Sequence, residues 1–238
     1  METGEKTLRD ITGALEDFKK ELPKYGWFPG PGESLEWWAG YRDPFHIAVT
    51  AVLVKLSRWE QADATLRRLT SMGLGEPRAL ANASLELVEG ALKSVSLWRS
   101  KAQTLKELSK LFLSHDLARE DVREGRRLLL NVHGVGYETA DSILLFAFNK
   151  STMPVSRQTL RILGRVGLKL GASYERVRLG ILESLGGDVY MLKLLHSSMT
   201  VIARVYCKAK ATKCGSCPLK RACNHALETS QGRIIVES

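Results

Sequence analysis

Apolar residues recur three and four positions apart along most of the chain, which is the period of an amphipathic helix. Four long stretches with this spacing lie in the first half, over 5–22, 48–69, 79–95 and 97–114. The same period continues over 120–132, 138–148, 157–168, 173–185 and 189–207. No stretch shows the sustained alternation of a β-strand, and the gaps carry the Gly, Pro and Ser of helix ends. The sequence therefore predicts an all-α fold.

One region interrupts the helical pattern, the aromatic and Gly/Pro-rich stretch 25–45. It is expected to form a long ordered loop between the first helix and the core. Its tryptophans Trp27, Trp37 and Trp38 have two possible uses. They can pin the loop to the body of the protein, or they can offer a platform on which nucleic-acid bases stack.

Charge and composition narrow the class of protein. The 238 residues are 44% hydrophobic, enough for a sizeable core, and carry a formal charge of +9 that favours a polyanionic partner such as nucleic acid. No stretch is long and apolar enough for a membrane span, and the charged beginning lacks the apolar core of a signal peptide. We expect a soluble, monomeric, intracellular protein without a membrane partner, which in a prokaryote would lie in the cytoplasm or nucleoid.

The four cysteines lie within seventeen residues, in the pattern C-x6-C-x2-C-x5-C, and are Cys207, Cys214, Cys217 and Cys223. Disulfides are disfavoured in an intracellular chain, where thiols are kept reduced. Four thiolates can bind a tetrahedral zinc ion or a 4Fe-4S cluster, and the spacing alone does not choose between them. No cysteine remains outside the set for a redox relay, so either group would be structural.

A second motif joins two predicted helices in the segment NVHGVGYETADS, residues 131–142. Glycines at positions 134 and 136 permit a tight turn, and backbone N–H groups at the start of the next helix can face a phosphate oxygen. The segment therefore predicts a helix-hairpin-helix that contacts the DNA backbone without reading its sequence. An ordinary interhelix turn is the alternative. The expected DNA contacts are His133, Gly134, Val135, Gly136, Tyr137, Thr139, Lys55 and Arg157.

A G-V-G hairpin followed about seventy residues later by this cysteine pattern resembles the endonuclease III family of helix-hairpin-helix DNA glycosylases. The likeness spans most of the chain, and the E-T-A-D run points to its endonuclease III-related or methyladenine-glycosylase-like branch. It implies a six-helix lobe over 43–148 with the hairpin, and a second lobe built from 1–42 and 149–238 that ends in a 4Fe-4S loop. Zinc is the weaker alternative. The implied partner is double-stranded DNA with a damaged or mismatched base, which is bent and flipped into a pocket between the lobes.

The resemblance also exposes three departures around the expected active site. The family has a catalytic Asp in a V-D-x-x-x-x-R segment, and the matching residues here are Val155, Ser156 and Arg161. Bifunctional members carry a Schiff-base lysine where this chain has Glu138. A loop that reads T-Q-N-T in the branch is V-K-L-S here, which places Lys55 where a DNA contact is expected. The candidate catalytic residues are accordingly Ser156, Glu138, Asp141 and Lys55.

Three hypotheses remain open at the sequence level. The chain is a DNA N-glycosylase whose active site is rearranged around Glu138, Asp141 or a water positioned by Ser156. Alternatively, it is a lesion-binding member that has lost catalysis, with Ser156 either natural or an engineered replacement of Asp. Thirdly, it is an abasic-site lyase that uses Lys55 as its amine.

Overall fold

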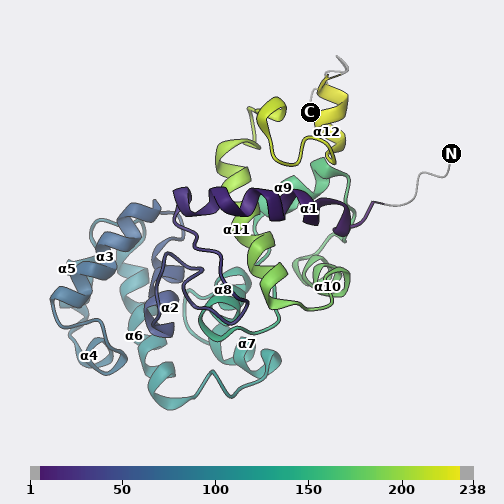
Figure 1. Ribbon diagram of the computed structural model, residues 1–238. Coiled ribbons are helices and arrows are strands. Elements are labelled where there is room, and N and C mark those ends of the chain that lie inside the picture. Colours follow the sequence, from purple (N-terminus) through teal and green to yellow (C-terminus); the bar gives the residue numbers. More distant parts are fainter. Residues whose placement is uncertain (1–5, 231–238) are drawn as a thin grey trace. The chain divides into compact units, whose positions relative to one another are not determined.

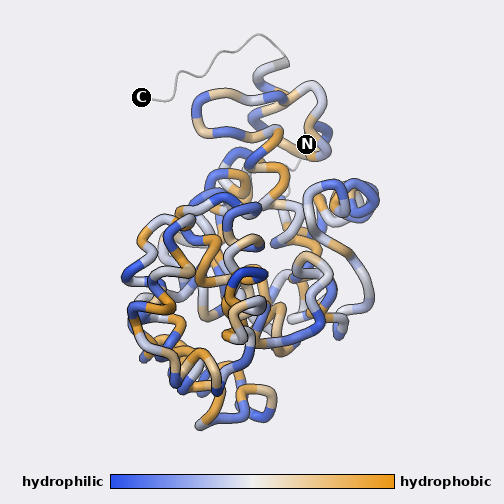
Figure 2. Tube along the Cα trace, turned by 90° about the vertical axis from the view of Figure 1, so that its left-hand side faces the viewer, coloured by the Kyte–Doolittle hydropathy of each residue, from blue (hydrophilic) through white to orange (hydrophobic). Residues whose placement is uncertain are grey.

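The computed structural model describes residues 6–230, and within that range the protein consists of helices joined by loops (Figure 1). Twelve α-helices and two short 3-10 helices make up these residues, with isolated bridges only between Trp27 and Trp38 and between Cys207 and Thr212. The all-α prediction is confirmed. Hydrophilic and hydrophobic residues are interspersed along the helices, as expected of amphipathic helices (Figure 2). No helix in residues 6–230 has the length and apolar character needed to cross a membrane.

The chain divides into two compact units. The first, called here the hairpin unit, is Gly40–Lys150. The second, called here the terminal unit, comprises the described parts of Met1–Ala39 and Ser151–Ser238. Each unit has its own buried apolar residues and is therefore a separate body with its own core.

The hairpin unit contains seven helices, which are α2 (Pro44–Leu53), α3 (Trp59–Ser71), α4 (Pro77–Asn82), α5 (Leu85–Leu92), α6 (Trp98–Ser114), α7 (Val122–Leu130) and α8 (Tyr137–Phe148). Helices α2 and α8 are apolar on nearly all sides and pack against each other at the centre. Asp43 starts α2 by accepting a hydrogen bond from the Phe45 amide at 2.8 Å, with Pro44 in the first turn. The long helix α6 packs against α2, α4, α5 and α7 and supports the hairpin.

Two predicted helices of the hairpin unit are in fact broken. The stretch 48–69 is interrupted between α2 and α3, where Leu56 has a φ of 55° in the left-handed region. The stretch 79–95 is interrupted between α4 and α5, where Ser84 caps the second helix by accepting from the Leu87 amide. In both places a lysine of α6 donates hydrogen bonds to backbone carbonyls at the break. At the first break Lys101 donates to the carbonyls of Leu53 and Lys55. These long-range bonds override the local helical pattern.

The terminal unit consists of α1 (Arg9–Phe18), η1 (Lys19–Tyr25), α9 (Arg157–Val166), α10 (Tyr174–Ser184), α11 (Val189–Val205), η2 (Cys214–Ser216) and α12 (Asn224–Ser230). The predicted first helix 5–22 changes to 3-10 geometry after Phe18, because Pro23 cannot continue an α-helix. Helix α11 packs against α1, η1 and α9. The aromatic loop is ordered on it: Lys193, fully buried, donates to the carbonyls of Gly32 and Ser34, both at 2.8 Å.

Candidate nucleic-acid interface and active-site residues

The hairpin between α7 and α8 is fixed by the helix behind it. Gly134 has a φ of 80°, and a Cβ atom there would collide with the hydroxyl of Thr104 on α6. The His133 amide donates to the Glu107 carboxylate of the same helix at 2.8 Å. Glycine is therefore required at position 134 both by its backbone conformation and by the close approach of α6.

Gly136 differs from Gly134 because the fold itself does not need it. Its φ of −98° suits any residue, and a Cβ atom would meet nothing within 4 Å in the described residues. Gly136 precedes the first turn of α8, where no side chain of the described part of the chain caps the helix. The N-terminus of a helix attracts an anion, and the missing Cβ leaves room for one to approach.

The other expected hairpin contacts differ in exposure. Tyr137 is exposed, with the Arg126 guanidinium 5.5 Å from its ring centroid. Val135 and Thr139 are buried, so their side chains are not available to a ligand. Arg157, in the terminal unit, is exposed in the first turn of α9.

The structure brings two candidate residues into direct contact. The Lys55 ammonium lies 2.9 Å from the Glu138 carboxylate, and both side chains are about 40% exposed, at 43% and 36%. This ion pair connects the loop between α2 and α3 to the first turn of α8. Because Lys55 is a cation in the pair, it would have to lose its proton before it could act as a nucleophile.

Asp141 is placed differently from Glu138. It lies one turn further into α8, is fully buried, and pairs with the Arg126 guanidinium at 3.0 Å. Arg126 is itself only 14% exposed. A buried, paired carboxylate of this kind joins α7 to α8, and it has no exposed surface to offer a substrate.

Ser156, in the terminal unit, is the N-cap of α9. Its hydroxyl accepts a hydrogen bond from the Thr159 amide at 3.0 Å and lies 2.9 Å from the Thr159 hydroxyl. Asp and Ser both cap helices well, so either residue can start α9 here. The difference between them is a negative charge at this point, which Ser156 lacks.

The cysteine loop lies between α11 and α12. The four cysteines are free thiols; Cys207 and Cys223 are buried and the other two are half-buried. Burial raises the pKa of the Cys217 thiol to about 11, and the charges of the other three thiols contribute to that rise. Arg165 of α9 donates to the Cys207 sulfur at 3.4 Å and to the Lys208 carbonyl at 2.8 Å.

The donor set of the cysteine loop consists of four thiols, which are ligands of both expected metal groups. In residues 6–230 no three His, Cys, Asp or Glu side chains are grouped as a single metal ion would require. Zinc would be held by four thiolates in a tetrahedral arrangement, and a 4Fe-4S cluster by one thiolate on each iron. The four thiols of the loop are therefore chemically suited to either group.

Two exposed residues of the hairpin unit were not among the candidates predicted from the sequence. Leu56, between α2 and α3, is 78% exposed, and Leu97, just before α6, is 61% exposed. Both have a φ of 55°, a conformation that is costly for a residue other than glycine. The V-K-L-S loop was the only signal in the sequence that pointed to Leu56. The left-handed backbone of both leucines depends on tertiary contacts and could not be predicted.

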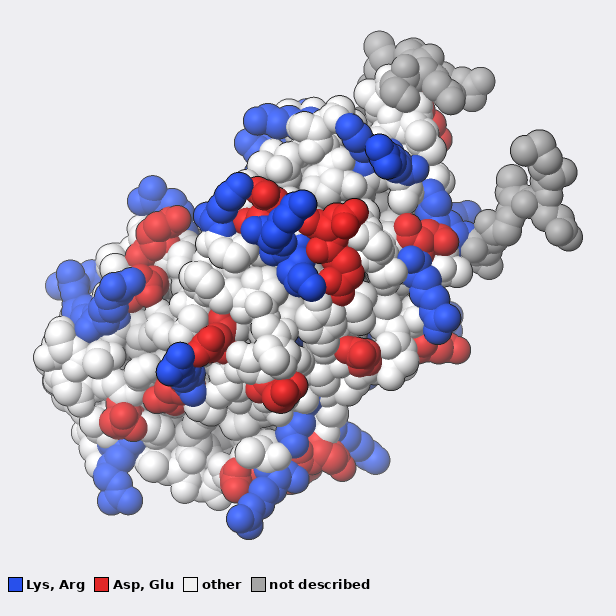
Figure 3. Space-filling model, in the orientation of Figure 1, with Lys and Arg blue, Asp and Glu red and all other residues white. Residues whose placement is uncertain are grey.

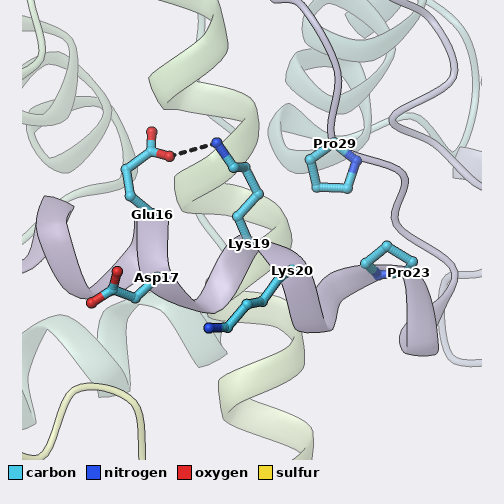
Figure 4. A pocket seen from close by; sticks show the side chains of 6 residues that line it. All are labelled: Glu16, Asp17, Lys19, Lys20, Pro23 and Pro29. Carbon is cyan, nitrogen blue, oxygen red and sulfur yellow. Dashed lines mark hydrogen bonds and ion pairs between the residues drawn. The ribbon is translucent and has the colours of Figure 1, made fainter.

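A hollow of about 460 Å³ on α1 and η1 is lined by Glu16, Asp17, Lys19, Lys20, Pro23 and Pro29 (Figure 4). Lys19 donates to the Glu16 carboxylate and to the Tyr190 hydroxyl, each at 2.8 Å. None of the candidate residues lines this hollow, and we assign it no function.

The helix-hairpin-helix supported by α6, together with a terminal cysteine loop, defines the class of DNA glycosylases with this fold. The chain is 30% identical to endonuclease III of Rickettsia conorii over 185 residues, which are 78% of the chain and 86% of that protein. It therefore belongs to the endonuclease III family of helix-hairpin-helix DNA glycosylases. No protein-family model matches the sequence.

Solved structures show the same fold. A non-covalent endonuclease III–DNA complex superimposes with a TM-score of 0.71 at 21% identity, covering 94% of this chain and 98% of the other. The H. pylori 3-methyladenine DNA glycosylase bound to 1,N6-ethenoadenine gives a TM-score of 0.66 at 20% identity, covering 82% and 96%.

Proposed function

We propose that this protein is a base-excision-repair glycosylase that binds double-stranded DNA, extrudes a damaged or mismatched base and cleaves its N-glycosidic bond. The observation that carries the proposal is the hairpin, in which Gly136 and the uncapped start of α8 leave space for a phosphate. Family membership and the likeness to an endonuclease III–DNA complex support DNA as the partner.

The DNA-contacting surface of the hairpin unit would combine polar and apolar groups. The α8 amides and Lys55 supply donors to phosphates, which fix position without reading sequence. Leu56 and Leu97, exposed in left-handed conformations, are apolar side chains suited to insertion between bases as the duplex bends. Such insertion would help to hold the duplex open after the base has left the stack.

Bond cleavage places positive charge on the sugar, which a nearby carboxylate stabilises. Ser156, at the position that resembles the family Asp, provides no charge. Asp141 is excluded from this role by its burial and its pairing with Arg126. We therefore assign the carboxylate to Glu138, which is accessible and which is released from Lys55 when a phosphate takes the lysine as its partner.

A lyase step is not expected from these residues. The position of the family's Schiff-base lysine holds Glu138, and Lys55 is an ion-paired cation. Borohydride reduction on DNA with an abasic site tests this point. The proposal predicts no covalent protein–DNA adduct, whereas an adduct lost in Lys55→Met would establish the lyase.

Cys207, Cys214, Cys217 and Cys223 are proposed to hold a 4Fe-4S cluster, with zinc as the alternative. When bound, the cluster supplies a structural cross-link of the loop. Around it, Lys208, Lys210 and Lys213 add positive charge beside the thiolates. Iron and zinc content of the purified protein, with visible absorbance, distinguishes the two groups.

A lesion-binding member with impaired catalysis is the second candidate function, favoured by the complete helix cap that Ser156 makes without a charge. Base release from a panel of damaged and mismatched duplexes separates the two. Release by this protein supports the glycosylase. Tight binding without release, together with release by Ser156→Asp, supports the impaired member.

A further inference from the structure

Lys101 of α6 is a buried cation whose partners are all in one loop. Only 5% of the residue is exposed, and its ammonium donates to the Leu53 carbonyl at 2.7 Å and to the Lys55 carbonyl at 2.6 Å. A third bond goes to the Ser57 hydroxyl at 3.0 Å. These three acceptors lie on both sides of Leu56.

The same network reaches the second left-handed leucine. The Ser57 hydroxyl, which accepts from Lys101, also accepts from the Ser96 amide at 3.0 Å. Ser96 directly precedes Leu97. Lys101 and Ser57 thus join the two turns that carry Leu56 and Leu97.

Left-handed backbone at a residue other than glycine persists only where the surroundings impose it. Between α2 and α3 the surroundings that do so are these hydrogen bonds and the bond from the Ser57 amide to the Val54 carbonyl, because Leu56 is 78% exposed and gains little from packing. Burial lowers the pKa of Lys101 to about 8, so the ammonium form prevails at neutral pH. Only that form has three N–H donors for three acceptors.

We propose that Lys101 is a positioning residue that holds the loop 54–57 and the turn at Leu97 in their DNA-contacting conformation. The proposal rests on the proposed function, in which Lys55, Leu56 and Leu97 contact DNA. Lys101 itself touches no substrate. It acts by fixing the backbone on which those three side chains stand.

Lys106 provides a matched control on the same helix. Its ammonium donates to the carbonyls of Ala81 and Ala83, at the break between α4 and α5. It is therefore a lysine of the same kind, five residues further along, that anchors a different loop. Loss of Lys106 disturbs the unit without touching the turns at Leu56 and Leu97.

The experiment compares Lys101→Ala and Lys106→Ala by two measurements on the full-length protein. Amide hydrogen exchange reports the order of the loops. Binding to a duplex with a tetrahydrofuran abasic analogue, and to the undamaged duplex, reports DNA contact. Both are repeated with propylammonium chloride, which can refill the cavity with a cation, and with sodium chloride at the same ionic strength.

In Lys101→Ala we expect faster exchange at residues 55–57 and 97, and affinity for the abasic-analogue duplex lower by about tenfold. Propylammonium should restore both, and sodium chloride should not. In Lys106→Ala exchange should rise only around residues 82–85, with affinity unchanged. Equal affinity losses in the two variants, or a Lys101→Ala loss that propylammonium does not repair, would overturn the proposal.

Ser57→Ala covers the case in which Lys101→Ala does not fold, since it removes a single acceptor of the network. Unchanged exchange at Leu56 and Leu97 in that variant contradicts the proposal. If the wild-type protein binds neither duplex, the proposed function fails. The exchange data then still decide whether Lys101 holds the loop.

Discussion

At the scale of single residues, the main question concerns Ser156. Its hydroxyl makes the cap bond to the Thr159 amide that an Asp would also make, so α9 can start in the same way with either residue. The stability of α9 therefore does not depend on whether position 156 carries a negative charge. The cost of the exchange should appear in catalysis.

Replacing Ser156 with Asp tests this separation of stability and catalysis. We expect base release to rise by on the order of 10²-fold, because the carboxylate stabilises charge on the sugar. The unfolding free energy should change by less than about 0.5 kcal/mol, because the cap is retained. Single-turnover kinetics and urea unfolding measure the two effects. Ser156→Asn is the control, since it caps without charge; an equal rise in that variant would contradict the explanation.

The two acids of α8 should respond in opposite ways. Asp141→Asn leaves Arg126 buried without its carboxylate partner and should lower the unfolding free energy by about 3 kcal/mol. Glu138→Gln alters an exposed pair and should change stability by less than about 1 kcal/mol. Base release should fall at least about tenfold in Glu138→Gln. Full activity in Glu138→Gln would remove Glu138 from the mechanism.

At the scale of elements, the two glycines of the hairpin have different roles. One is required by the fold, and the other leaves space for a ligand. Gly134 has positive φ and lies against Thr104 of α6. Gly136 has ordinary φ and open space around it. The sequence motif showed both glycines but could not distinguish these reasons.

Alanine at each position tests the distinction. Gly134→Ala should destabilise the protein by more than about 1 kcal/mol, because alanine is strained at positive φ and meets the Thr104 hydroxyl. Gly136→Ala should leave the melting temperature unchanged and weaken DNA binding by about tenfold, since its methyl group occupies the space for a phosphate. Thermal unfolding and a DNA titration of both variants provide the measurement. Undiminished affinity in Gly136→Ala would argue against phosphate binding there.

The sequence predicted the helical elements well where the residues that determine them are close together in the chain. The hairpin, the cap at Ser156 and the apolar α8 all follow from residues within one or two turns of each other. The breaks at Leu56 and at Ala83 did not follow, because they depend on Lys101 and Lys106, which are more than twenty residues away along the chain. A buried lysine of α6 looks like any surface lysine in the sequence.

The sequence predicted which residues belong to the candidate site better than it predicted how they are placed and paired. Lys55 and Glu138 were both expected near DNA, but their ion pair required the tertiary structure, as did the burial of Asp141. The sequence named both Glu138 and Asp141 as candidates to replace the family Asp. The structure distinguishes the two acids by their exposure. On an apolar helix the exposure of each position is set by the elements that pack around the helix.

At the scale of the whole molecule, a formal charge of +9 coexists with a surface of mixed sign. On the face shown in Figure 3, acidic and basic side chains are interspersed. Net charge alone therefore does not define where DNA binds. The binding surface of the hairpin unit is defined by local features, namely the open start of α8 and the turns that carry Leu56 and Leu97.

The most direct test of the account is base release from a panel of damaged and mismatched duplexes, with the strands analysed before and after alkali. We predict that at least one duplex loses its base, that its strand breaks only after alkali, and that Ser156→Asp releases the same base faster. If neither protein releases a base from any duplex, the assignment as a glycosylase is contradicted.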